Sequence, residues 1–315
     1  MNVLITGVAG FIGSSTAKEL LKKDNCNIIG IDNFNDYYNP KFKEDNIKGL
    51  KIKLYRCNIT DFNKLKQIFQ ENKIDKIIHL ASMVGVRYSI QNPLIYGDVN
   101  IKGTLNMLEL AKQHKCKKFV FGSSSSVYGN NKKIPFSEED PVNPISPYGA
   151  TKASAEILCR TYHLLYNLPI ICLRFFTVYG PNGRPDMAPY KFTERIFCNK
   201  ELEVYGDGTS KRDYTYITDI VYGIIKSLGI DVGFKIINLG DSNPTELKKL
   251  INFIEKNLGK SANITFKEVQ QGDVEQTYAD ISKARKLLGY EPKVKIEDGI
   301  KLLCEWYLKN RAGNN

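Results

Sequence analysis

The sequence has few residues that bind metal ions and no pattern that marks secretion or membrane insertion. Its 315 residues include three histidines, and the seven cysteines form no Cys-x-x-Cys pair. This spacing excludes the usual zinc motifs, and an odd number of cysteines is typical of a reducing compartment. No apolar run reaches the roughly 18 residues of a membrane span, and the chain begins with a predicted strand rather than a signal peptide. We expect a cytoplasmic protein without a metal site and without membrane contact.

Acidic residues are outnumbered, with 34 Asp and Glu against 45 Lys and Arg, which gives a formal net charge of +11. The lysines are scattered along the chain instead of being grouped with aromatic residues into one basic stripe. This distribution argues against nucleic-acid binding and indicates a solvated, lysine-rich surface. We expect a few arginines to be reserved for an anionic small molecule.

Strand and helix patterns alternate through the first half of the chain. Near-continuous apolar strands separated by helices predict a parallel sheet covered on both faces. The expected fold class is therefore α/β, with a doubly wound, Rossmann-type sheet. The predicted strands are Met1–Thr6, Asn27–Ile31, Ile52–Tyr55, Ile74–Leu80, Lys118–Gly122 and Pro169–Phe176, with helices to about Lys23 and over Asn63–Glu71 and Gly97–His114.

The pattern changes after about Gly180, where loops rich in Gly, Pro, Asp and Tyr interrupt shorter elements. We predict a smaller α/β lobe over residues 176–315 that binds a substrate against a dinucleotide-binding domain of residues 1–175. The chain is expected to return to the first domain around residues 210–240. Helices are predicted over Lys191–Cys198, Asp219–Ser227, Thr245–Leu258 and Asp298–Lys309.

Three glycines in GVAGFIG, at Gly7, Gly10 and Gly13, occupy the turn between the first strand and its helix. Glycines allow a tight turn and a close approach to a pyrophosphate at the helix N-terminus. Asp32 ends the next strand, about 20 residues further on, where a carboxylate binds ribose hydroxyls and repels a 2′-phosphate. NAD is therefore the predicted cofactor, in preference to NADP. Gly259 resembles part of a P-loop, but the earlier glycine is missing, so we predict a helix C-cap there.

Tyr148 and Lys152 are four residues apart, which places them on one face of a predicted helix. A tyrosine titrates near 10, and a neighbouring ammonium favours its phenolate, which makes the phenol a usable base. Such a pair alone is commonly a surface feature. The glycine turn and the serines of Ser123–Ser126 after a predicted strand favour a catalytic role.

These motifs resemble the extended short-chain dehydrogenase/reductase family over essentially the whole chain, together with HLAS, SSSSVYG, YGATK and RDY. The resemblance implies Tyr148 as base, Ser124 as its hydroxyl partner, and Lys152 as a contact of the nicotinamide ribose. It also implies a homodimer formed through the helices of Gly97–His114 and Tyr148–Tyr166. The implied NAD-binding residues are Gly7, Gly10, Phe11, Ile12, Gly13, Asp32, Asn33, Asn58, Ile59, Leu80, Ala81, Ser82, Asn100 and the residue at position 122, Gly122.

The segment after Ser124 distinguishes between the reactions of this family. Members that act as 4,6-dehydratases carry Asp and Glu there, and decarboxylases of UDP-glucuronate carry a Glu, whereas this chain has Ser125 and Ser126. Neutral hydroxyls do not readily relay the protons of elimination. The substitution favours inversion at carbon 4 of the sugar, in which a hydride leaves for NAD and returns to the other face.

Segments at DNFNDYYNPKFKEDNI, GVRYSIQNP and Arg174–Thr193 resemble the UDP-glucuronate 4-epimerases. Arg184 and Arg87 are candidates to bind the uronate carboxylate, because a guanidinium can bind it bidentately. The alternative for Arg184 is an ion pair with Asp186. The other residues that the resemblance places at the UDP-sugar are Ser125, Ser126, Thr177, Lys191, Phe192, Val204, Tyr205, Arg212, Gln270 and Asp273.

Other functions stay open at this point. A 4-epimerase of neutral UDP-hexoses or their N-acetyl forms is the nearest alternative, followed by a UDP-glucuronate decarboxylase. A non-enzymatic NAD-binding regulator is the third, although Tyr148, Lys152 and Ser124 are all present.

Overall fold

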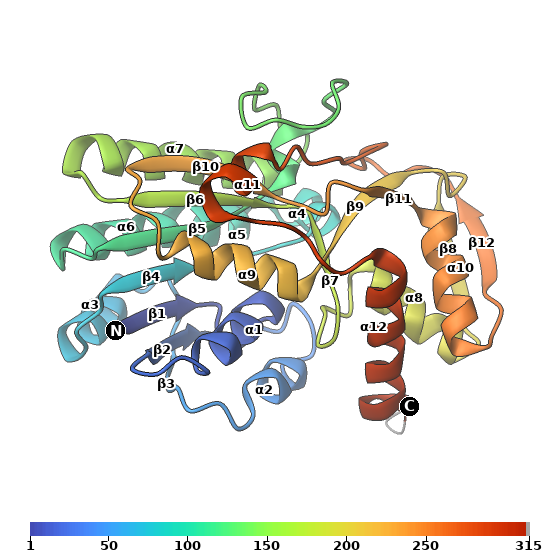
Figure 1. Ribbon diagram of the computed structural model, residues 1–315, viewed down its shortest axis with the longest axis horizontal. Coiled ribbons are helices and arrows are strands. Elements are labelled where there is room, and N and C mark those ends of the chain that lie inside the picture. Colours follow the sequence, from blue (N-terminus) through green and yellow to red (C-terminus); the bar gives the residue numbers. More distant parts are fainter. Residues whose placement is uncertain (313–315) are drawn as a thin grey trace.

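The computed structural model describes residues 1–312 and contains a large parallel sheet with helices on both faces, beside a smaller lobe (Figure 1). The strands lie in the order β10-β6-β5-β4-β1-β2-β3, and every neighbouring pair is parallel. This arrangement confirms the doubly wound fold class. The strands are β1 (Asn2–Thr6), β2 (Asn27–Asp32), β3 (Lys53–Arg56), β4 (Lys76–His79), β5 (Lys118–Ser124), β6 (Ile170–Phe175) and β10 (Phe234–Leu239).

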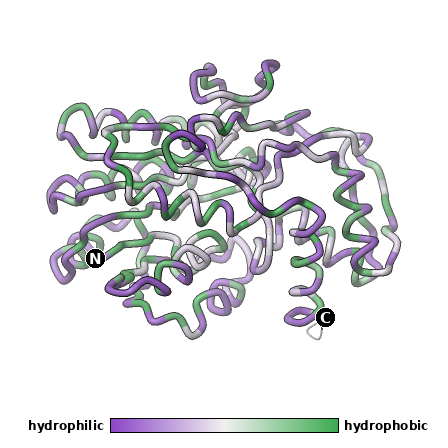
Figure 2. Tube along the Cα trace, viewed as in Figure 1, coloured by the Kyte–Doolittle hydropathy of each residue, from purple (hydrophilic) through white to green (hydrophobic). Residues whose placement is uncertain are grey.

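Both faces of the large sheet are buried, which explains the continuous apolar runs in its strands. Neighbouring residues such as Leu4 and Ile5, or Ile77 and Ile78, point to opposite faces and are fully buried. Figure 2 shows hydrophobic stretches along the central strands, whereas the loop that projects above the sheet is mainly hydrophilic. The strand order reverses between β1 and β4, and this reversal opens a crevice at the carboxyl ends of the strands.

Two groups of helices cover the sheet. Apolar residues of α1 (Phe11–Leu20) and α9 (Ile217–Ser227) belong to the core on one face. Residues of α3 (Phe62–Glu71), α6 (Gly103–Gln113) and α7 (Pro147–Tyr166) belong to the core on the other. The sequence predicted one continuous helix over residues 97–114, but its first part is a π-helical turn, η1 (Gly97–Lys102).

The smaller lobe consists of two small sheets and three helices that pack on one another. One sheet has the order β11-β9-β7, and the other is a parallel pair of β12 and β8. Gly259 ends α10 with φ of 63°, which confirms the predicted C-cap. The elements of this lobe are β7 (Thr177–Tyr179), α8 (Ala188–Phe197), β8 (Glu201–Tyr205), β9 (Lys211–Tyr216), β11 (Pro244–Glu246), α10 (Leu247–Leu258), β12 (Asn263–Lys267) and α12 (Ile296–Asn310).

β10 extends the large sheet beside β6, so the chain returns from the small lobe to the sheet. No strand was predicted there, although FKIINL has as many apolar residues as IDKIIHL, which was predicted as a strand. The domain limits at residues 175 and 176 stay a prediction. The remaining short helices are α2 (Lys41–Ile47), α4 (Val86–Gln91), α5 (Pro93–Tyr96), η2 (Ser125–Tyr128) and α11 (Ser282–Leu288).

Within residues 1–312, no helix is both long enough and apolar enough to cross a membrane. The cytoplasmic location stays a prediction. Five of the seven cysteines are buried, as the apolar segments around them predicted.

Asp213 of β9 ties together segments that are far apart in the sequence. Its fully buried carboxylate accepts hydrogen bonds from the backbone N–H groups of Asp241 at 2.7 Å, and of Ser242 and Ala279 at 3.0 Å. The Thr215 hydroxyl donates a further bond at 3.2 Å. One side chain therefore connects the strand, the turn after β10 and the segment before α11.

Replacing Asp213 with Asn should destabilise the fold, since the amide nitrogen cannot accept hydrogen bonds from the backbone donors that face it. Each buried donor left unpaired costs about 1–3 kcal/mol, so we expect a total loss of about 3 kcal/mol or more. Chemical denaturation measures this loss. Asp231→Asn, at an exposed loop position, is the control and should unfold like the parent. Equal midpoints for the two variants would contradict the assigned role of Asp213.

Candidate active site

A cavity of about 400 Å³ lies where the carboxyl ends of the parallel strands meet the small lobe. The loops after β1, β2, β3, β4, β5 and β6 all contribute to its wall. The small lobe supplies Arg184, Met187 and Arg212, together with the segment from Gly272 to Val274. The cavity therefore lies at the edge of the sheet where α/β proteins bind nucleotides.

The glycine turn fits a dinucleotide. Gly7 has φ of 69°, a conformation that other residues rarely adopt. A Cβ atom on Gly13 would lie 2.1 Å from the Gly7 carbonyl oxygen, so only glycine allows α1 to begin this close to β1. Within the described chain, no side chain caps the N-terminus of α1. Its free N–H groups and the positive end of its dipole are available to a pyrophosphate.

Asp32 lies on the cavity wall at the end of β2 and is held by backbone donors. Its two carboxylate oxygens accept hydrogen bonds from Ala9 N at 3.0 Å and Phe34 N at 2.9 Å. Each oxygen keeps a further acceptor position, which suits the hydroxyls of a ribose. The other predicted cofactor residues on the wall are Gly10, Phe11, Ile12, Asn33, Asn58, Ile59, Leu80, Ala81, Ser82 and Gly122.

Asn100 lies behind this wall rather than on it. It belongs to η1 and is 1% exposed. Its amide donates to Met83 O and to Thr151 Oγ1, both at 3.0 Å, while its oxygen accepts from Met83 N and Ser82 Oγ. Asn100 thus joins the wall segment after β4 to helix α7, and any effect on the cofactor passes through Ser82 and Met83.

His79 holds the same region from the sheet side. Its Nδ1 lies 2.7 Å from Thr6 Oγ1 and its Nε2 lies 3.1 Å from Thr104 Oγ1. Burial, with a smaller effect of the Lys152 charge, lowers the pKa of His79 to about 3, so the ring is neutral. Thr104 donates its proton to Asn100 O, and therefore its oxygen accepts from Nε2. We infer the Nε2–H tautomer, with Thr6 donating to Nδ1.

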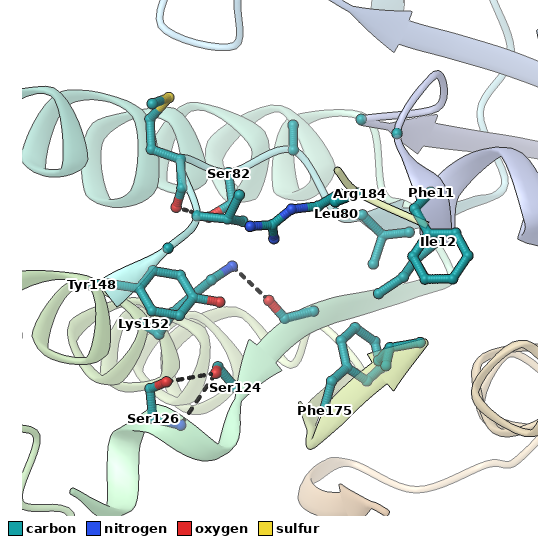
Figure 3. Close-up of a pocket in the computed structure, with 18 of the residues that line it drawn as sticks. Phe11, Ile12, Leu80, Ser82, Ser124, Ser126, Tyr148, Lys152, Phe175 and Arg184 are labelled. Carbon is teal, nitrogen blue, oxygen red and sulfur yellow. Dashed lines mark hydrogen bonds between the residues drawn. The ribbon is translucent and has the colours of Figure 1, made fainter. Parts of the chain in front are cut away.

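The structure brings together Tyr148, Lys152 and Ser124, as the sequence predicted. Helix α7 begins at Pro147, because Ser146 caps it by accepting a hydrogen bond from Gly149 N at 3.2 Å. Lys152 is buried and donates to Gly122 O at 2.7 Å. Figure 3 shows the phenol of Tyr148 beside this ammonium group, with Ser124 and Arg184 on either side of it.

The charges around Tyr148 are set by burial and by two neighbours. Burial raises the pKa of Tyr148, while the hydrogen bond from Ser124 and the positive charge of Arg184 lower it. Burial lowers the pKa of Lys152 to about 7, and the negative charge of Glu156 opposes this effect. The sequence suggested that Lys152 would favour the phenolate, but it did not suggest that Arg184 would contribute.

Hydroxyl groups and one guanidinium line the cavity next to Tyr148. They come from Ser125 and Ser126 of η2, Thr177 of β7 and Arg184. Ser124 Oγ accepts from Ser126 N at 3.1 Å and lies 3.2 Å from Ser126 Oγ. Among the described residues on the wall, the only acidic side chains are Asp32 and Asp273. The described wall therefore has hydroxyl groups, from Ser125 and Ser126, in the segment after Ser124.

Arg184 is both an ion-pair partner and part of the wall. Its Nε lies 3.0 Å from Asp186 Oδ1, and its Nη2 also donates to the Asp186 carboxylate. The Tyr37 hydroxyl donates to the same carboxylate at 3.0 Å. The two alternatives considered for Arg184, an ion pair and a ligand contact, are thus compatible.

The predicted nucleotide contacts fall into two groups. Arg212 and Asp273 lie on the wall. Arg87, which the sequence suggested as a contact of the uronate carboxylate, binds Asp273 at 2.8 Å, and its guanidinium lies 4.2 Å from the centre of the Tyr205 ring. Among residues 1–312, five other predicted contacts do not line the cavity: Lys191, Phe192, Val204, Tyr205 and Gln270.

Several wall residues were not predicted. Tyr37 and Tyr38 come from the loop after β2, and Phe175 lies opposite Ser124 in the register of β6 and β5. The rule that parallel strands end at one edge of the sheet could have identified Phe175. The segment DNFNDYYNPKFKEDNI, which contains both tyrosines, was singled out only by its resemblance. Which of its side chains reach the cavity depends on how this long loop folds back.

Comparison with known proteins agrees with this geometry. The family model described as GDP-mannose 4,6 dehydratase matches residues 4–303. A UDP-glucuronate 4-epimerase from Thermodesulfobacterium geofontis is 46% identical, over 98% of this chain and 96% of the relative.

Two solved structures are similar over nearly their whole length. UDP-glucuronic acid 4-epimerase from Bacillus cereus, in complex with UDP-glucuronic acid and NAD, is 39% identical with a TM-score of 0.92, and the match covers 98% of this chain and 99% of that one. UDP-glucose 4-epimerase from Thermotoga maritima, with UDP-glucose, is 32% identical with a TM-score of 0.92 and the same coverage.

Replacing Gly13 with Ala should reduce the amount of bound NAD, because the new methyl group meets the Gly7 carbonyl. We expect a stability loss of about 1–3 kcal/mol as the turn and α1 move apart. The measurements are the NAD content of the purified protein and its thermal midpoint. Gly97→Ala is the matched control, since a Cβ there has no neighbour within 4 Å among the described residues. Normal NAD content in the Gly13 variant would show that the turn does not hold the cofactor.

Proposed function

This chain belongs to the extended short-chain dehydrogenase/reductase family, and we propose that it interconverts UDP-glucuronate and UDP-galacturonate by inverting carbon 4 of the sugar. It acts as an NAD-dependent epimerase. The observation that carries the proposal is the half-buried Tyr148, with Lys152 and Arg184 beside it and neutral hydroxyls after Ser124. Identities of 46% and 39% with UDP-glucuronate 4-epimerases, over nearly the whole chain, support it.

The chain's own residues move one proton in each direction. NAD, when bound, supplies the chemistry of accepting a hydride from carbon 4 and returning it. Tyr148 takes the proton of the carbon-4 hydroxyl as a phenolate, and Ser124 orients that hydroxyl by hydrogen bonding. Lys152 stabilises the phenolate by its positive charge. The 4-keto sugar then turns in the cavity so that its other face is open to the returning hydride. Tyr148 gives the proton back to the oxygen at carbon 4.

A uronate places a further demand on the site, because a 4-keto uronate is a β-keto acid that loses carbon dioxide readily. We propose that Arg184 holds the carboxylate together with hydroxyls from Ser125, Ser126 and Thr177. Asp186 occupies Nε and Nη2 of Arg184, which leaves Nη1 for the ligand. Several fixed contacts of this kind would prevent the carboxylate from turning into the orientation in which its bond to carbon 5 breaks.

A second candidate is a 4-epimerase of neutral UDP-hexoses. Its support is the similarity to the Thermotoga maritima UDP-glucose 4-epimerase, whose TM-score equals that of the uronate enzyme. Arg184 beside Tyr148 favours the uronate, since a neutral sugar gives a guanidinium no ionic partner.

Purified protein incubated with UDP-glucuronate and no added NAD should produce UDP-galacturonate. Proton NMR measures the product through the changed couplings at carbon 4 of the sugar. Tyr148→Phe should keep its NAD content and lose turnover by about 100-fold or more, as expected when a general base is removed. Turnover of UDP-galactose alone would select the neutral-sugar epimerase. Release of carbon dioxide with a UDP-pentose would identify a decarboxylase, and no reaction in a protein that contains NAD would reject all three.

We also propose that the protein is a homodimer whose subunits meet through α6 and α7. Ile157, Leu164 and Leu165 of α7 are each about two-thirds exposed and lie on one helix face. Leu94 of the neighbouring α5 is 85% exposed. Large apolar side chains grouped in this way mark an interaction surface, and a second copy would cover them with the same residues.

Changing both Ile157 and Leu164 to Lys should convert the dimer into a monomer, because like charges would face one another across the two-fold axis. Analytical ultracentrifugation at micromolar protein measures the mass. Leu302→Lys with Leu308→Lys is the matched control, at two partly exposed leucines of α12. The proposal fails if the unchanged protein is a monomer, or if the control pair dissociates it equally.

A further inference from the structure

Three consecutive residues of β5 bind three consecutive turns of α7. Gly122 O accepts a hydrogen bond from Lys152 Nζ at 2.7 Å, and Ser123 Oγ donates to Glu156 Oε1 at 2.5 Å. Ser124 hydrogen bonds to Tyr148. The three helix residues are spaced by four, so they share one helix face. Two of these contacts belong to the proposed catalytic set, whereas the third, at Glu156, has no part in it.

Glu156 is half of a fully buried ion pair. Arg174 of β6 donates to it through Nε at 2.9 Å and Nη2 at 2.7 Å, and the two side chains are 4% and 1% exposed. Arg174 faces Ser123 in the strand register, and its guanidinium lies 4.6 Å from the centre of the Tyr128 ring. Removing two charges from water is costly, and apolar replacements of such pairs are often as stable. Stability alone therefore does not account for this pair.

We propose that Glu156, held by Ser123 and Arg174, is a positioning residue for the reaction, whose buried negative charge stabilises the ammonium group of Lys152 one turn away. A charge inside the protein acts strongly over this distance, because little water screens it. Arg174 fixes the carboxylate and prevents it from turning to Lys152 to form a direct ion pair. Lys152 therefore keeps its charge and stays bound to Gly122 O, next to Tyr148.

The surroundings of Lys152 leave Glu156 as the main source of this effect. Burial lowers the pKa of Lys152, and Glu156 is the largest influence that raises it, followed by Cys159 of the same helix. His79 of β4 is neutral, as shown above, and Tyr148 of α7 and Phe121 of β5 complete the neighbourhood. Without Glu156, Lys152 would lose its proton at a lower pH.

Glu156→Gln keeps the shape of the side chain and removes its charge. We expect kcat near neutral pH to fall by about tenfold, which corresponds to a shift of about one pKa unit, while KM and NAD content stay within about twofold. The alkaline limb of the pH profile should move to lower pH, because Lys152 would lose its proton at a lower pH. Arg160→Gln, which removes an exposed charge one turn further along α7, is the matched control. Its pH profile should match that of the unchanged protein.

Glu156→Gln leaves Arg174 buried and unpaired, so the variant can fail to fold. The double variant Glu156→Gln with Arg174→Met removes both charges and should remain folded, with the alkaline limb shifted in the same direction but less far, because loss of the Arg174 charge offsets part of the loss of the Glu156 charge. A folded double variant with an unshifted pH profile would make the pair purely structural and overturn the inference.

The inference rests on the proposed Tyr148–Lys152 chemistry but not on the choice of sugar, and one measurement separates the two. Protein labelled with ¹³C at the lysine side chains gives a signal for Lys152 that is missing in Lys152→Met. Its titration midpoint should be lower in the double variant than in the unchanged protein. If no UDP-sugar reacts, the proposed function fails while this titration still tests Glu156. An equal midpoint overturns the role of Glu156 whatever the substrate.

Discussion

Parallel strands all end at the same edge of their sheet, and this constraint assembles the site. The chain places a glycine turn after β1, Asp32 at the end of β2 and Ser124 at the end of β5, far apart in the sequence. Parallel pairing brings these residues to one edge of the sheet. Helix α7 crosses this edge and adds Tyr148 and Lys152. Everything that touches the cavity therefore depends on the register of β5 against its neighbours and of α7 against β5.

Burial is the second condition on which the chemistry depends, and it acts on Tyr148 and Lys152 in opposite directions. Removal from water disfavours the phenolate and also the ammonium, so each group alone would lose its charge. A phenolate and an ammonium group next to one another each favour the charged form of the other. Arg184 adds a further positive charge and Glu156 a further negative one. Burial prevails at Tyr148, whose pKa lies above the ordinary value of a tyrosine, so its ionisation during the reaction depends on the positive charges around it.

The sequence predicted those parts of the site that are short and periodic. The glycine turn, Asp32 and the Tyr148–Lys152 spacing each report a local geometry, and six of the seven large-sheet strands followed from apolar runs. What it could not predict depends on contacts between distant segments. Three examples are contacts between residues of different elements: the ion pair of Arg87 with Asp273, the hydrogen bond of Asn100 to Thr151 behind the wall, and the ion pair of Glu156 with Arg174. No pattern within one segment contains that information.

Arg184 links the choice of substrate to the acid–base chemistry. Its positive charge lowers the pKa of Tyr148, and the neighbouring Asp186 already offsets part of that charge. A substrate carboxylate at Nη1 would offset more of it, so binding of a uronate would raise the pKa of Tyr148: the phenolate would be a stronger base but would form less readily. A neutral sugar would leave the full effect of Arg184 on the phenol. In the proposed arrangement, the same guanidinium binds the uronate carboxylate and sets the pKa of Tyr148, so the choice of sugar and the strength of the base are coupled.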